Sequence, residues 1–380
     1  MKPNVTDTAT DAARRAPFVW GLVAFLVCAE AMRRWITGSV PADLSAYIAA
    51  ADVFARGENP YGPALFESAH YDGFVYVYPP GTLPLIEPFS LLSSRLISAA
   101  DVVVRTAALV FALRWVRRAL DLALPTAWLV LLAFFYQPVL VDFMAGNMTT
   151  YMFGAFAACM WMAYDEPEWW HPLAAVGLGV VLAFKPMWGL PTGLVLLVRG
   201  RYKLAAGLLA GASVVAGLSF VDWHGEVLVD AWLARVAAVR EHYRSADLLS
   251  LAPGLLPVAA LTWLGAGAWL VRRRGRQDDM LWLWACVSLF AWPRLGTYSY
   301  VFVLPALGFL WTRWGWRKAL LVGLVAFGPL PWMMRAFHLD FAHLVLLFVW
   351  SVVVAIATGV ELTRKGGMRP KTTLPSHVEK

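Results

Sequence analysis

The run Asn147-Met-Thr-Thr-Tyr-Met-Phe-Gly-Ala-Phe-Ala-Ala-Cys-Met-Trp-Met-Ala-Tyr164 contains no charged side chain. A helix that crosses a bilayer needs roughly 17–25 mostly apolar residues, and this run is long enough. Comparable runs lie at 18–36, 96–114, 125–143, 203–221, 252–271, 280–296, 319–337 and 341–361, with shorter pieces at 172–184, 187–198 and 299–311. They predict an all-α polytopic membrane protein with about 12 transmembrane helices.

The composition of the 380-residue chain excludes an ordinary soluble domain. Hydrophobic residues make up 60% of the chain and charged residues only 15%, against roughly 25% charged residues in a typical soluble protein. The mean hydropathy is +0.60. A surface this apolar is stable where lipid surrounds it.

Lysine and arginine gather in short clusters between the apolar runs, which is typical of cytoplasmic loops. We predict a cytoplasmic N-terminus at 1–17, a single transmembrane domain at 18–363 and a cytoplasmic tail at 364–380. The net charge of +7 then reflects topology and membrane lipids, and we expect no nucleic-acid partner. The clusters are Arg14-Arg15, Arg114 to Arg118, Arg199 to Lys203, Arg272 to Arg276, Arg313 to Lys318 and Arg364 to Lys371.

Two longer segments, 37–95 and 222–251, fall on the opposite, exoplasmic side. The first predicts a juxtamembrane helix that begins near Asp43 and ends at Gly57, with Tyr47 one turn after Asp43 on the same face. Asp43 has two interpretations, a helix N-cap or a functional carboxylate. The stretch 82–93 is too short to span and is expected at the membrane surface. Glu30, inside the first apolar run, should be neutral or paired with Arg33 or Arg34.

Four motifs, in order along residues 40–305, resemble those of glycosyltransferase family 87, a family of the GT-C superfamily. They read Asp43-x-x-x-Tyr47 with Arg56-Gly-Glu-Asn-Pro-Tyr61 and Tyr78-Pro-Pro, then Gly146-Asn-Met-Thr149, then Ala183-Phe-Lys-Pro186, and finally Trp292-Pro-Arg294 with Tyr298-Ser-Tyr300. In the last motif, Arg294 and Ser299 stand where His and Asp are common in the family.

The resemblance implies a GT-C-like fold and a polytopic enzyme that uses a polyprenyl-phosphate sugar as donor. It implies that Asp43 is the general base that takes the proton of an acceptor hydroxyl. One base fits an inverting transfer to a glycolipid or glycan, although Asp52, Asp72 and Glu67 leave a second carboxylate open. Mannose is favoured over arabinofuranose by the family alone.

Cations outside the cytoplasmic clusters are candidates for holding the donor phosphate. They are Lys185, Arg240, His242, Arg244 and Arg294. Lys185 has a second interpretation, in which its ammonium group reaches the membrane interface. The cluster at 235–244 has one too, as an amphipathic helix beside anionic lipid head groups.

Polar side chains in the same loops and at one helix junction are candidates for binding the sugar or the acceptor. They are Tyr47, Tyr61, Asp72, Tyr78, Asn147, Thr149 and Tyr298. The tyrosines also fit an interfacial aromatic belt, and Asn147 and Thr149 also fit backbone satisfaction at a helix junction. No residue cluster has metal-ligand spacing, so we predict no metal and no cofactor, although members of the superfamily use a divalent ion.

The sequence thus predicts a multi-pass enzyme of the bacterial inner membrane with its active site on the periplasmic side. A transporter or flippase for a lipid-linked glycan is the main alternative, and an assembly subunit without chemistry is the third class. A transporter would place polar residues through the middle of the membrane, whereas here they are expected at its exoplasmic edge.

Overall fold

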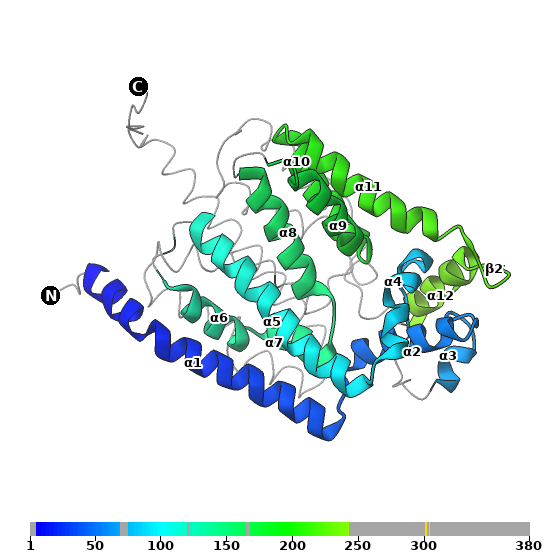
Figure 1. Cartoon of the computed structure of the whole chain (residues 1–380), viewed down its shortest axis with the longest axis horizontal. Coiled ribbons are helices and arrows are strands. Elements are labelled where there is room, and N and C mark those ends of the chain that lie inside the picture. Colours follow the sequence, from blue (N-terminus) through cyan, green and yellow to red (C-terminus); the bar gives the residue numbers. More distant parts are fainter. Residues whose placement is uncertain are drawn as a thin grey trace.

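The computed structural model of the chain describes residues 5–68, 75–119, 122, 124–164, 168–242, 301 and 304, and these are predominantly helical (Figure 1). The predicted spans at 252–271, 280–296, 319–337 and 341–361 lie outside the described residues, as do most of the piece at 299–311 and the tail at 364–380. The count of about 12 spans therefore stays a prediction.

Long helices pack side by side from the N-terminus onward (Figure 1). Helix α1 (Val5–Thr37) packs on α5 (Ser94–Ala119) and α6 (Thr126–Phe135), and α5 packs on α8 (Thr149–Tyr164). Of the helices described, two are long and apolar enough to cross a bilayer, at Asp11–Thr37 and Ser94–Ala119. Helix α1 starts well before the predicted boundary at residue 18.

The predicted span at 125–143 is broken into two helices, and whether the pair crosses the bilayer stays a prediction. The chain forms α6 and then α7 (Gln137–Ala145), and the two axes are bent by 74°. The break falls at Tyr136, which has an extended ψ of 113°, just before Pro138 in the first turn of α7. Proline has no backbone N–H to continue the helical hydrogen bonds, which explains the interruption.

The predicted separation of two short helices at Lys185-Pro186 is confirmed. Helix α9 (His171–Ala183) ends just before Lys185, and α10 (Pro186–Val198) begins just after it. Helix α11 (Tyr202–Leu218) then returns along α9.

Glycines in α11 bring its backbone into direct contact with α9. A Cβ added to Gly207 would lie 2.4 Å from the Pro172 carbonyl oxygen, and one added to Gly211 would lie 2.0 Å from the Val176 carbonyl oxygen. These two glycines are four residues apart and therefore lie on one face of the helix. Such small-residue spacing lets membrane helices approach closely.

Short elements gather beside one end of the long helices, near the labels α2, α3, α4 and α12 of Figure 1. They are α2 (Ala42–Ala55), α3 (Ala64–Glu67), η1 (Pro80–Thr82), α4 (Leu83–Ile86), η2 (Glu87–Leu91), the antiparallel hairpin of β1 (Asp222–Trp223) and β2 (Glu226–Val227), and α12 (Val229–His242). The stretch 82–93 therefore forms short helical turns, in agreement with the prediction that it does not span.

The predicted helix after Asp43 is confirmed as α2, and Gly57 follows it with a φ of +78°. Nearly all of the helix from Leu44 to Phe54 is buried against other parts of the protein, and its place at the membrane interface stays a prediction. The elements α4, α7 and η2 pack against the helix, and Ala49, Ala50 and Ala51 within it are fully buried. Helix α2 is thus held rigidly by its surroundings.

Replacing Gly211 by Ala is expected to destabilise the protein by about 1–3 kcal/mol, because the new methyl group must push α11 away from α9. The matched control is Gly217→Ala in the same helix, where an added Cβ meets nothing within 4 Å. Unfolding in detergent micelles measures both variants. Equal stability of the two would contradict the close packing of α9 and α11.

Candidate functional site

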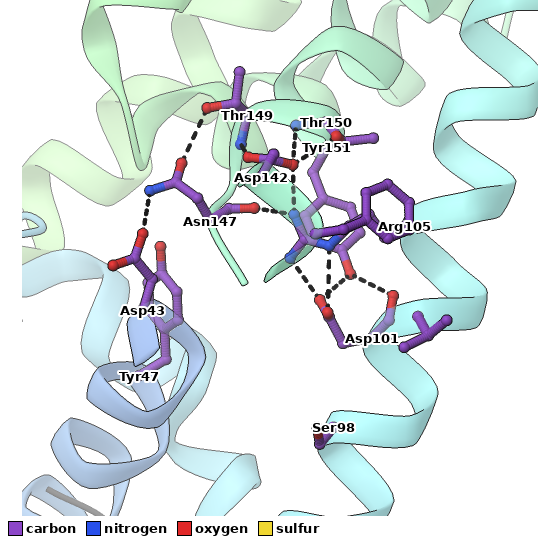
Figure 2. Close-up of polar contacts among 12 residues, drawn as sticks. Asp43, Tyr47, Ser98, Asp101, Arg105, Asp142, Asn147, Thr149, Thr150 and Tyr151 are labelled. Carbon is purple, nitrogen blue, oxygen red and sulfur yellow. Dashed lines mark hydrogen bonds and ion pairs between the residues drawn. The ribbon is translucent and has the colours of Figure 1, made fainter. Parts of the chain in front are cut away.

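Asp43 is the second residue of α2, and the capping interpretation of it is wrong. The N-cap position belongs to Pro41, and no side chain makes a capping hydrogen bond there. The Asp43 carboxylate instead faces Asn147, which lies 104 positions further along the chain (Figure 2). The Asn147 Nδ2 donates to Asp43 Oδ2 at 2.5 Å.

The side chain of Asn147 brings four of the sequence-predicted residues together. Its Nδ2 donates to Asp43, while its Oδ1 accepts from Lys185 Nζ at 2.5 Å and from Thr149 Oγ1 at 3.0 Å. The four side chains come from α2, the turn before α8, the start of α8 and the junction of α9 with α10. The roles predicted for them remain predictions.

Gly146 allows the Asn147 turn to approach α2. It ends α7 in the left-handed conformation with a φ of +72°, a region that favours glycine. An added Cβ would lie 2.7 Å from Pro41 Cβ and 2.8 Å from Leu44 Cβ. A glycine is therefore needed at position 146 for two reasons, the left-handed backbone conformation and the lack of space for a Cβ beside α2.

Lys185 occupies the N-cap position of α10, in the gap between α9 and α10, and it is buried. Its ammonium group contacts the Asn147 amide oxygen inside the protein, so the interpretation as a lysine that reaches the membrane interface is wrong. The break between the two helices puts the side chain there, because Pro186 cannot supply a hydrogen-bond donor to the preceding turn.

Burial raises the pKa of Asp43 above its usual value, because the charged form loses solvation. The hydrogen bond from Asn147 and the positive charges of Lys185 and Arg105 oppose this effect and lower the pKa in part. The net direction is upward. An aspartate with a raised pKa is a stronger base than an ordinary one.

A buried ion network lies directly behind the Asn147 turn, and the sequence analysis missed it (Figure 2). Arg105 is fully buried, and its Nη1 donates to Asp142 Oδ2 at 2.7 Å. Its Nη2 donates to Asp101 Oδ1 at 2.7 Å, and its Nη1 also donates to the Asn147 carbonyl oxygen. One guanidinium group therefore joins α5, α7 and the turn that carries Asn147.

The Asp142 carboxylate also accepts hydrogen bonds from the start of α8. It accepts from the backbone N–H groups of Thr149 at 3.2 Å and Thr150 at 3.1 Å, and from Thr150 Oγ1 at 2.5 Å. A carboxylate is favourable at a helix N-terminus, where the N–H groups point outward without partners. The turn from α7 to α8 is thus fixed at both ends.

The network extends to α1 through Arg34. Arg34 Nη1 donates to Asp101 Oδ2 at 3.2 Å, and its Nε donates to Glu30 Oε1 at 2.8 Å. Arg33 also pairs with Glu30, at 2.7 Å. The prediction that Glu30 is paired with Arg33 or Arg34 is confirmed.

A sequence signal for this network does exist. Asp101 and Arg105 are four residues apart within the apolar run 96–114, and Asp142 lies within the run 125–143. Ionisable residues inside such runs are rare, and they usually face protein partners. The expectation that polar residues gather at the exoplasmic edge stays a prediction.

Tyr47, Tyr61 and Tyr78, all predicted site residues, form one cluster beside α2. The Tyr47 hydroxyl donates to the Tyr78 hydroxyl at 2.5 Å, and the Tyr61 hydroxyl donates to the Tyr78 carbonyl oxygen at 2.6 Å. Tyr47 and Tyr61 are buried, so they are not part of an aromatic belt facing lipid. Arg235 of α12 donates to the Tyr61 carbonyl oxygen and holds the segment in place from the outside.

The remaining predicted residues are not brought to this site by the described structure. Asp52 pairs with Arg56 at 2.5 Å, and Glu67 lies on the exposed surface. Arg240 and His242 belong to α12, and only their backbone is described. Within the described part of the chain, no three His, Cys, Asp or Glu side chains are grouped to hold a metal ion. Asp72, Arg244, Arg294 and Tyr298 lie outside the described residues.

Replacing Arg105 by Met is expected to cost about 3–5 kcal/mol of stability, because it leaves Asp101 and Asp142 as buried carboxylates without their cation. The matched control is Arg33→Met, whose partner Glu30 is partly exposed, with an expected cost of less than about 1 kcal/mol. Unfolding in mixed micelles compares the two variants. A cost for Arg105→Met no larger than the control's would show that the network does not hold the helices together.

Comparison with known proteins gives one match. The model of glycosyltransferase family 87 matches residues 76–293, which is more than half of the chain. The match covers Arg105, Asp142, Asn147 and Lys185, while α2 with Asp43 precedes it. No curated protein and no solved structure matches significantly.

Proposed function

The chain belongs to glycosyltransferase family 87, and from that premise we propose that it transfers mannose from a polyprenyl phosphate to a glycolipid or glycan hydroxyl. Asp43 acts as the general base. The observation that carries this proposal is the Asp43 carboxylate itself, which is held by Asn147 at the start of a buried helix and has a raised pKa.

The proposed reaction needs one proton acceptor at the attacking oxygen. The acceptor hydroxyl gives its proton to Asp43, its oxygen forms a bond to the anomeric carbon, and the bond from that carbon to the phosphate oxygen breaks. Polyprenyl phosphate leaves with the electron pair. A direct displacement of this kind inverts the anomeric centre, so a β-linked donor gives an α-linked product.

Lys185 supports the proposal from the phosphate side. Its buried ammonium group donates to the oxygen of the same Asn147 amide whose nitrogen donates to Asp43. A cation near the leaving group stabilises the negative charge that develops on the phosphate. Arg294, which follows Pro293 in the sequence, is the second cation we assign to this task.

The membrane side of the reaction follows from the placement of Lys and Arg. The basic clusters lie in loops assigned to the cytoplasm, and α2 belongs to a segment assigned to the opposite side. We therefore place the reaction on the periplasmic face of a bacterial inner membrane, where the enzyme meets membrane lipids, the donor and the acceptor. The proposal needs no cofactor.

Replacing Asp43 by Asn is expected to lower sugar transfer by at least about 10²–10⁴-fold, because the amide cannot take the proton. The assay supplies purified protein with polyprenyl-phosphate mannose and total host lipids and follows new mannolipid. The matched control is Asp52→Asn on the same helix, where the carboxylate pairs with Arg56, and it should keep activity within a fewfold. Full activity of Asp43→Asn would remove Asp43 as the base.

The sugar is tested by exchanging the donor in the same assay. Transfer from polyprenyl-phosphate mannose alone supports the proposal, and transfer from polyprenyl-phosphate arabinose alone would change the sugar while leaving the reaction intact. Absence of transfer from both donors by folded wild-type protein would contradict the proposed function and favour a transporter.

The pH dependence gives a second test of Asp43. Because only the ionised carboxylate accepts a proton, kcat/KM should fall as the pH is lowered through the pKa of Asp43. An ordinary aspartate has a pKa of about 4. Since the pKa of Asp43 is raised, the fall of kcat/KM should begin at a higher pH than an ordinary aspartate would give. The profile of kcat/KM against pH measures this limb. A limb at the position of an ordinary aspartate would contradict the role of burial.

A further inference from the structure

We propose that Asn147 is a positioning residue that commits one carboxylate oxygen of Asp43, leaves the other oxygen, Oδ1, to accept the proton, and separates the base from Lys185. This inference rests on the proposed function, because it names the reacting atom of the base. It stands on the hydrogen bonds around one amide group.

The orientation of the Asn147 amide follows from its neighbours. One end of the amide meets the Lys185 ammonium group, which can only donate, together with the Thr149 hydroxyl. That end must be the oxygen, because an NH2 group cannot accept from an ammonium. The NH2 group therefore points to Asp43, whose carboxylate accepts from it.

The backbone of Asn147 cannot rotate to change this arrangement. Arg105 donates to the Asn147 carbonyl oxygen from one side. The Asp142 carbonyl oxygen accepts from the Gly146 N–H at 2.9 Å and from the Asn147 N–H at 3.1 Å. Because the neighbouring groups are buried, moving the turn would break several of these hydrogen bonds at once.

The hydrogen bond from Asn147 distinguishes the two oxygens of Asp43. Oδ2 accepts from Asn147 Nδ2, and a proton placed on Oδ2 would face that donor and weaken the bond. Among the described residues, no hydrogen bond is made to Oδ1. The proton of the acceptor hydroxyl is therefore received at Oδ1, while Oδ2 stays bound to the amide.

The amide also separates two opposite charges. Lys185 contacts the amide oxygen, and the ion pairs of the described residues include none between Lys185 and Asp43. A direct lysine–aspartate pair would stabilise the carboxylate and make it a weaker base. With the amide between them, the charges interact only over a longer distance, and the base keeps its strength.

The groups that face Asp43 come from four elements. Lys185 at the junction of α9 with α10 and Arg105 of α5 act on its carboxylate by charge, and Asn147 touches it directly. Tyr47, on α2 itself, interacts with the Asp43 charge but donates its hydroxyl to Tyr78. Substitutions at Asn147 change the one direct contact and leave these charges in place.

Two substitutions at Asn147 should shift the ionisation of Asp43 in opposite directions. Asn147→Asp keeps acceptors for Lys185 and Thr149 but sets one carboxylate against another. The midpoint of the acid limb in the profile of kcat/KM against pH should therefore move up by about one pH unit or more. Asn147→Ala removes a hydrogen bond that lowers the pKa of Asp43, but it also lets Lys185 pair directly with the carboxylate. Because a charged donor stabilises a carboxylate more than a neutral amide does, the midpoint of the acid limb should move down by about one pH unit. Both should lower kcat at least about tenfold.

The matched control is Asn59→Asp, which makes the same chemical change in the segment that follows α2. Asn59 donates to Glu226 and accepts from the Tyr61 N–H, with no contact to Asp43. This variant should leave the acid limb unchanged. The double variant Asn147→Ala with Lys185→Met should reverse the fall of the limb, because the approaching cation is gone.

Infrared spectroscopy tests the same inference without any transfer reaction. The carboxylic acid band that is lost in Asp43→Asn identifies Asp43, and its disappearance with rising pH reports ionisation. The pH at which this band disappears should shift in opposite directions in Asn147→Asp and Asn147→Ala. That result would support the inference even if the wild type transferred no sugar, so failure of the proposed function and failure of this inference are distinguishable. No shift, or a shift in one direction for both folded variants, would overturn it.

Discussion

The packing of the described helices around the candidate site depends on the buried guanidinium of Arg105. An isolated charge in an apolar interior is very costly, so this group persists only because two carboxylates and a carbonyl oxygen surround it. Asp101 lies on the same helix, whereas Asp142 and Asn147 lie beyond the bend that follows α6. The ion pairs therefore fix the angle between helices as well as the charge balance.

This network determines where the candidate base lies. Asp142 holds the start of α8, and Arg105 holds the carbonyl of Asn147, so the turn between α7 and α8 has little freedom. Gly146 lets that turn come close to α2, and the Asn147 side chain then reaches Asp43. The position of a carboxylate on a short helix is thus set by charges inside the neighbouring long helices.

Local patterns predicted α2 and the break at Lys185-Pro186, because helical spacing and proline act within a few residues. Local rules failed where a distant partner competes with a nearby one. The capping rule favoured the backbone N–H groups for Asp43, yet Asn147 takes the carboxylate across 104 positions of sequence. The same limit hid the partners of Arg105, although the charges themselves stood out in apolar runs.

In the motif Gly146-Asn-Met-Thr149, the sequence pattern located the candidate site but did not predict which atoms contact each other there. Its glycine supplies a left-handed turn and an approach that a Cβ would block. Its asparagine offers a donor and an acceptor on one rigid plane, so it binds a carboxylate and an ammonium group while keeping them apart. Its threonine fills the remaining acceptor position of the amide oxygen. Each residue type follows from the geometry that surrounds the carboxylate, and an aspartate in place of Asn147 would keep the acceptors for Lys185 and Thr149 but lose the donor to Asp43.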